Sequence, residues 1–194
     1  DTTKTDTTYW KIILQDIDLQ NVSFALQMPL DSLALSTSLA KASLRNGLID
    51  LHKSAYSLQS FKIENGQVNY DSGAPSLLPP DSIALRGLDP SHIALTGIGV
   101  QLDSLHYEGR DMKAIINRFV LKERSGLELL STQGRLLSNQ KSLRIPSLRL
   151  TTSNSDFELN ASIDWDVFEM KSKGRLSARL MADIGKQDII RLVG

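Results

Sequence analysis

The chain contains no cysteine, and this absence excludes disulfides, thiolate zinc sites and thiol nucleophiles. Neither sign of charge is in excess, because 22 Lys plus Arg balance 22 Asp plus Glu. A protein that binds phosphate backbones needs a surplus of positive charge, so nucleic acid is not expected as a partner. No apolar run approaches the roughly 18 residues of a membrane-spanning helix, and residues 1–8 have no signal-peptide pattern. We expect a globular segment from which any signal or membrane anchor has been removed.

Catalytic motifs are also missing. The Gly-x-Ser-x-Gly nucleophile elbow, the dinucleotide fingerprint and the phosphate-binding loop are absent. The three histidines, His52, His92 and His106, show no spacing typical of metal ligands, and His92 is interpreted as a surface imidazole. We therefore expect no enzyme, no metal and no cofactor.

One group of carboxylates lies close together along the chain. Asp103, Glu108 and Asp111 could perform acid and base chemistry if one of them were buried beside another. Proximity across a turn does not create a shared cleft, so these residues are interpreted as solvated strand and turn positions.

Apolar residues recur mainly two positions apart, which is typical of β-strands with one wet face. Residues 157–163, with the sequence FELNASI, illustrate the pattern. The sequence predicts an all-β fold with at most one or two short helices, one of them an amphipathic turn at 186–193. Residues 30–51 fit either a helical face or short strands, and strands are favoured. Pairs such as Asn46–Gly47 punctuate the apolar runs.

Four stretches contain the same one-residue slip in this alternation. They begin at Ile17, Phe61, Ile93 and Leu143, and their slips fall at Asn21, Asn65, Gly97 and Ser147. A slip requires either a two-residue hairpin or an extra residue in the strand. A hairpin would force Val22 and Ile98, both β-branched, to positive φ, so a bulge or sharp bend is favoured at all four sites. Such bends curl an antiparallel sheet into an elongated groove or half-pipe. About a dozen strands would stack to a length on the order of 60 Å.

Prolines gather between two of these stretches. Residues 71–92 contain Pro75, Pro79, Pro80 and Pro90 and are expected to form a long connection. The chain 1–194 is thus interpreted as one elongated β segment with two sub-regions, about 1–70 and 93–194.

Several stretches resemble a known family. Residues 61–71, FKIENGQVNYD, are similar to a recurring element of AsmA-like proteins. Residues 88–109, 121–127, 145–155 and 174–188 are similar to the N-terminal repeats of TamB-type translocation and assembly modules. Most of the chain is covered, although each motif is degenerate. The membrane anchor and the long C-terminal region of a complete member are lacking, which indicates a fragment.

This resemblance implies a periplasmic segment of a protein anchored in the inner membrane. Its β-groove would carry phospholipid towards the outer membrane, with acyl chains held on the apolar side. An alternative is a structural module that binds an outer-membrane barrel, or another envelope protein, by adding a strand at a sheet edge. A closed sandwich, with its apolar faces packed together, is the plain structural alternative. The candidate groove-lining residues are Ile17, Leu19, Phe24, Phe61, Ile63, Val68, Ile93, Leu95, Val100, Ile145, Leu148 and Leu150.

Overall fold

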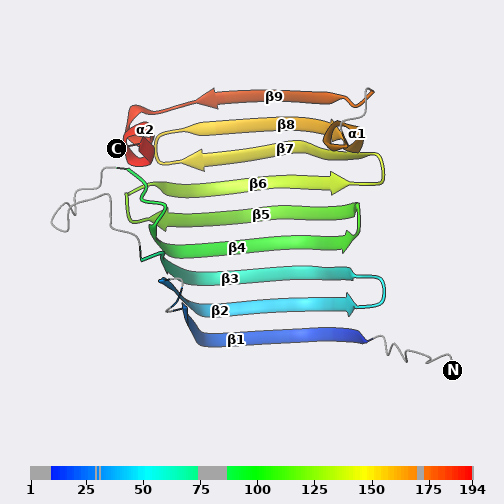
Figure 1. Ribbon diagram of the computed structural model, residues 1–194, viewed down its shortest axis with the longest axis horizontal. Coiled ribbons are helices and arrows are strands. Elements are labelled where there is room, and N and C mark those ends of the chain that lie inside the picture. Colours follow the sequence, from blue (N-terminus) through cyan, green and yellow to red (C-terminus); the bar gives the residue numbers. More distant parts are fainter. Residues whose placement is uncertain (1–9, 29, 31, 74–86, 170–172, 194) are drawn as a thin grey trace.

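The computed structural model describes residues 10–28, 30, 32–73, 87–169 and 173–193. In this part of the chain nine antiparallel strands form one sheet in sequence order, so each strand pairs with the strands before and after it (Figure 1). The sheet is not closed into a barrel, because β1 and β9 remain its two edges. The strands are β1 (Lys11–Met28), β2 (Leu33–Asp50), β3 (Ala55–Asp71), β4 (His92–Glu108), β5 (Asp111–Glu123), β6 (Glu128–Ser138), β7 (Ser142–Thr152), β8 (Asp156–Asp164) and β9 (Leu176–Asp183).

The expected all-β class is confirmed, with two short helices. Residues 30–51, which were ambiguous in sequence, contain β2 as a continuous strand. Helix α2 (Lys186–Val193) lies where an amphipathic turn was expected, whereas the single turn α1 (Trp165–Phe168) was not predicted. The nine described strands are fewer than the estimated dozen, so the sheet spans about 38 Å at roughly 4.8 Å per strand spacing.

The predicted slips are irregularities inside strands rather than hairpins. Asn21, Asn65 and Gly97 have φ angles of 51°, 53° and 60°, in the left-handed region. The pairing register shifts on both sides of Gly66 in β3 and between Ile145 and Leu148 in β7, so the fourth slip also coincides with an irregularity. A residue in this conformation reverses the side on which the following side chains emerge.

Two further kinks were missed. Asn46, taken as turn punctuation, has a φ of 50° inside β2, and Ser104 has a φ of 54° inside β4. Asn and Ser tolerate this region better than β-branched residues because their side chains are short and polar. The kinks recur from strand to strand, and together they curl the sheet into a half-pipe.

The long connection joins two strands that lie side by side. Asp71, at the end of β3, pairs with His92, at the start of β4. The strands of the N-terminal and C-terminal sub-regions therefore share a single sheet. Most of the connection, residues 74–86, lies outside the described residues.

The two helices lie at opposite ends of the strands (Figure 1). At the end near α1, Arg110 of the β4–β5 turn lies over the ring of Trp165, 5.5 Å from its centroid, and binds Glu169. At the other end, Leu88 donates a backbone hydrogen bond of 3.2 Å to Leu192 of α2. Neither helix packs across the sheet as a second layer. None of the described helices is long and apolar enough to cross a bilayer.

Candidate apolar groove

One row of apolar side chains crosses the whole sheet. It begins at Ile17 in β1 and reaches Leu180 in β9 through residues that are directly paired from each strand to the next. Directly opposite residues in a sheet project from the same face, so these residues share one side of the half-pipe. We call this set the central row: Ile17, Leu44, Phe61, Leu102, Ile116, Gly134, Leu148, Leu159 and Leu180.

Further rows cross the long strands β1 to β4 on the side of this line that lies towards the end of β3. Leu19 is opposite Ala42, Ala42 is opposite Ile63, and Ile63 is opposite Val100. The row continues into β5, where Val100 is opposite Phe119. Two more rows lie nearer the end of β3: Phe24–Thr37–Val68–Leu95 and Leu26–Leu35–Tyr70–Ile93.

The three candidates in β7 pair into β8 and β9. Ile145 is opposite Ala161, and Leu150 is opposite Phe157, while Leu148 belongs to the central row. The structure thus arranges the twelve sequence-derived residues in rows on β1, β3, β4 and β7, and the central row joins these two parts of the sheet.

In the part of the chain that the structure describes, no second layer covers this face. Among the described residues, none with a large side chain is less than 2% exposed. The buried apolar residues in the described part of the chain are small ones, Ala42 at 6% and Ala161 at 9%. Leu180, in the central row, remains 63% exposed. A closed sandwich would instead bury its largest side chains most deeply.

A glycine in the central row is covered by a neighbouring leucine. A Cβ atom added at Gly134 would lie 2.8 Å from Cδ1 of Leu148. Because Gly134 has no side chain, Leu148 can occupy the space above β6. The row therefore stays continuous at a place where two side chains would clash.

Sequence reasoning missed more than half of the central row. Leu44 lies in the segment that could be read as a helix, and Ile116, Leu159 and Leu180 lie in strands without a recognised slip. Alternation alone marks them as apolar-face residues, but only the pairing register shows which ones are adjacent.

The opposite face carries charged pairs. Arg45 in β2 donates hydrogen bonds of 2.8 and 2.9 Å to the two carboxylate oxygens of Asp18, and it lies 3.3 Å from Asp16. The hydrogen bond to Asp18 raises the pKa of Arg45. Further along, Lys62 binds Glu64 and lowers the pKa of that carboxyl. Ion pairs of this kind fit a solvated face.

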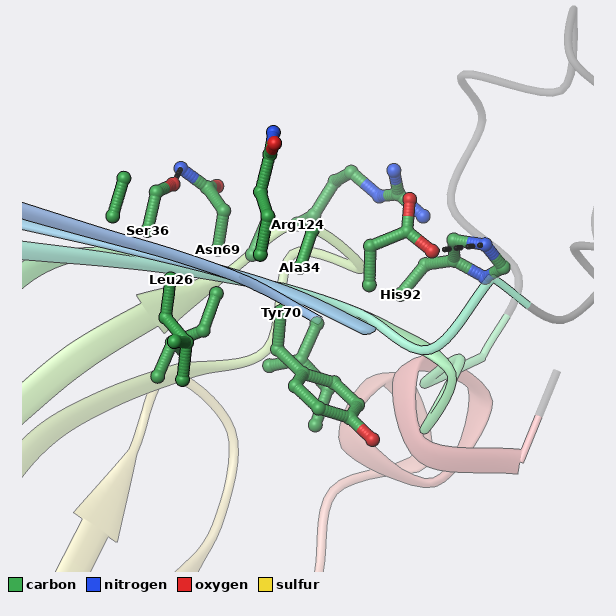
Figure 2. A pocket seen from close by; sticks show the side chains of 13 residues that line it. Leu26, Ala34, Ser36, Asn69, Tyr70, His92 and Arg124 are labelled. Atoms are coloured by element: carbon green, nitrogen blue, oxygen red, sulfur yellow. Dashed lines mark hydrogen bonds and ion pairs between the residues drawn. The ribbon is translucent and has the colours of Figure 1, made fainter. Parts of the chain in front are cut away.

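A cavity of about 320 Å³ lies where the ends of β1 to β4 meet. Figure 2 shows Leu26 and Tyr70 on one side of the sheet and Ser36 and Asn69 on the other. The Nδ2 atom of Asn69 donates a weak hydrogen bond of 3.4 Å to Ser36. The polar wall of this cavity therefore belongs to the face opposite the apolar rows.

The interpretation of His92 as a surface imidazole is wrong. Its side chain is 18% exposed and lies between two carboxylates. Nδ1 is 3.0 Å from buried Asp89, and Nε2 is 3.4 Å from Asp71. Each ring nitrogen lies near a carboxylate, so the imidazole links the end of β3 to the start of β4.

The carboxylates near the β4–β5 turn do not form a site. Asn117 donates a hydrogen bond to Asp103, whereas Glu108 and Asp111 are exposed and face each other across the turn. In the described part of the chain, no group of three or more His, Asp or Glu side chains is arranged to hold a metal ion.

The most buried polar cluster anchors α2. Asp188 is 3% exposed and accepts hydrogen bonds from Thr152, from Asn154 at 3.0 Å and from Ser155 at 2.6 Å. Burial by itself would raise the pKa of Asp188, but these bonds and nearby Arg191 outweigh burial and lower it. The cluster ties the C-terminal helix to the β7–β8 turn.

Comparisons with known proteins give no relatives. No family model matches the chain, and no match is found among curated proteins or solved structures. The candidate groove therefore has to be interpreted from its own geometry.

Proposed function

We propose that this chain is a periplasmic β-groove domain similar to those of AsmA and TamB proteins. The groove holds phospholipid acyl chains, and the domain thereby assists lipid transport to the outer membrane or the biogenesis of that membrane. The full-length protein would be anchored in the inner membrane. The observation that carries the proposal is the central row, which is apolar across nine strands and over which none of the described residues packs as a second layer.

Physical chemistry favours an apolar occupant for such a face. Half-buried Leu, Ile and Phe side chains gain about 25 cal/mol for each Å² removed from water, and acyl chains supply a matching surface. The central row is about 38 Å long, whereas the hydrocarbon core of both leaflets is about 30 Å thick. The row is long enough to hold an acyl chain at full extension.

The ionisable side chains among the described residues are consistent with a binding role. The imidazole of His92 lies between two carboxylates, and Arg45 pairs with Asp16 and Asp18 on the opposite face. The proposal therefore assigns no catalytic role to the chain and no cofactor.

A charge on the apolar face tests the proposal. Val100 is half-buried in β4, and Val100→Asp would place a carboxylate among the apolar rows, where a bound acyl chain would desolvate it. We expect phospholipid adducts on the wild-type chain in native mass spectrometry after incubation with phosphatidylethanolamine and phosphatidylglycerol vesicles. We expect these adducts to be lost in the variant.

The matched control is Gln101→Asp, which adds the same charge to the opposite face of the same strand, between Lys62 and Arg118. It should retain the adducts. Leu180→Asp, at a position that is already 63% exposed, repeats the test where folding is least at risk. A wild-type chain without adducts, or adducts that persist in both apolar-face variants, would contradict lipid binding.

The second candidate is an assembly module that binds an outer-membrane barrel, or another envelope protein, by strand addition. It is favoured by the open edge of β9, where Leu176 and Leu180 are 65% and 63% exposed. Main-chain hydrogen bonds would carry that interaction, so Val100→Asp should leave it intact.

A further inference from the structure

The β1 edge is the longest exposed edge in the sheet. Its 18 residues pair with β2 on one side only, which leaves half of its backbone N–H and C=O groups directed outwards. Its side chains are also uncovered, because Trp10, Ile13 and Phe24 are 65%, 69% and 54% exposed. An edge of this length and apolarity requires either protection or a partner strand.

The kinks of β1 restrict which strand can pair with it. Asn21 is in the left-handed conformation, and by the flanking register it lies opposite Ala40 of β2. At the other slip, Gln15 of β1 lies opposite left-handed Asn46 of β2. Each slip therefore needs one left-handed residue contributed by one of the two strands. In a regular strand paired with β1, the apolar residues beyond the first slip would project from the opposite face of the sheet.

The apolar spacing of β1 reads the same in both directions. Counted outwards from Asp18, apolar-face residues lie at one, four, six and eight positions on both sides: Ile17 and Leu19, Leu14 and Val22, Ile12 and Phe24, Trp10 and Leu26. The two slips, at Gln15 and Asn21, are also symmetric about Asp18. A second antiparallel β1 centred on Asp18 thus matches every one of these apolar-face residues and both slips.

In this register the kink geometry seen between β1 and β2 is repeated. Left-handed Asn21 of each copy would lie opposite Gln15 of the other, in the place that Asn46 takes in β2. The arrangement uses conformations that β1 already has, so it requires no new strain.

The charges on the face opposite the apolar rows are balanced in such a pair. Asp16 and Asp18 of both copies would meet near the symmetry axis, and Arg45 of each copy already binds its own two carboxylates. Lys41 of β2, which lies opposite Gln20, adds a second cation in each copy. Four carboxylates thus face two guanidinium and two ammonium groups.

The contact area is adequate for a stable pair. Residues 10–26 extend for about 56 Å at roughly 3.3 Å per residue, and a sheet edge with its side chains is about 10 Å thick. This edge covers on the order of 560 Å² in each copy and about 1,100 Å² in the pair, which meets the roughly 1,000 Å² expected of a specific interface.

We propose that the β1 edge is a homotypic interface, at which a second copy of this chain adds its own β1 in antiparallel register about Asp18. The two sheets then form one continuous half-pipe with the longest strands at its centre. The inference depends on the β1 edge alone and is independent of whether lipid binds.

The absence of cysteine allows a direct test. In the proposed pair Asp18 faces its own copy, and directly opposite Cα atoms lie about 4.5–5.5 Å apart, within disulfide range. Asp18→Cys should therefore form an intermolecular disulfide under mild oxidation, shifting the chain from 21.5 kDa to twice that mass. Asp18 lies on the solvated face, 47% exposed, so the substitution should not prevent folding.

The control variants use the same strand. Ser23→Cys and Ile13→Cys should not cross-link as single variants, because each lies about 33 Å from its own equivalent, but they should cross-link when mixed. Wild-type chain should show the doubled mass in sedimentation without any cross-link. A wild-type chain that stays monomeric, or cross-linking that is equally efficient for Asp18→Cys and Ser23→Cys alone, would overturn the proposal, as would a dimer formed through β9.

Discussion

Asn21, Asn46 and Asn65 are single residues that reverse the face of a long strand. Each has a φ near 50°, a conformation that costs little for Asn and Gly and much more for β-branched residues. The apolar side chains before and after each kink stay on one face because of this reversal. The conformational tolerance of a few short polar residues therefore maintains the continuous apolar surface.

Replacing one of these residues should expose that dependence. Asn65→Val forces a β-branched residue to a φ of 53° in β3, and we expect it to destabilise the fold by about 1–3 kcal/mol. Asn65→Gly, which adopts this conformation freely, is the matched control and should stay within about 0.5 kcal/mol of wild type. Urea unfolding of both variants measures the difference, and equal stabilities would show that the kink is not constrained by conformation.

Helix α2 is held to the sheet end by polar contacts more than by apolar packing. Ile189 and Leu192 are 49% and 48% exposed, whereas Asp188 is buried among hydroxyl and amide donors. Because the attachment depends on a carboxylate, protonation should release it.

The pH dependence follows from the lowered pKa of Asp188. Its stabilising contribution is fully present above the unfolded value of about 3.9 and is lost as pH falls through the folded pKa. We expect the NMR amide signals of residues 186–193 to shift in acid to the values of a helix that has separated from the sheet. Asp188→Asn should show these shifted signals already at neutral pH, because it weakens the attachment of α2 by about 1–3 kcal/mol. Signals that do not change in either case would show that α2 is held by other contacts.

The described part of the molecule is a series of neighbouring strands, and no large side chain in it is fully buried. The main contacts of every strand are with the strands beside it, and strand length falls from 18 residues in β1 to 8 in β9. Stability in such an array is close to a sum of local and nearest-neighbour contributions, so opening can occur at one end without unfolding the other.

Hydrogen exchange should reveal this gradient. We expect the amides of β2 to β4 to be the most protected and those of β9 to exchange fastest, because β9 is short and has one open edge. Leu159→Ala should cost about 1–2 kcal/mol at a half-buried site and speed exchange in β7 to β9, while β2 and β3 stay unchanged. Peptide-resolved mass spectrometry checks this, and uniform acceleration along the chain would indicate a single cooperative unit.

The sequence by itself determined the all-β class, the four original slips and the apolar character of one face, because alternation and left-handed tolerance are local properties of residues such as Asn65 and Gly97. It did not place Leu180 beside Leu159, identify the kink at Asn46 or show His92 between two carboxylates. These facts depend on the pairing register and on where the chain comes back to the sheet after each connection, and both bring together residues that are distant in sequence. The tertiary structure likewise decided that no second layer of described residues covers the apolar face, since an alternating strand has the same pattern in an open groove and in a closed sandwich.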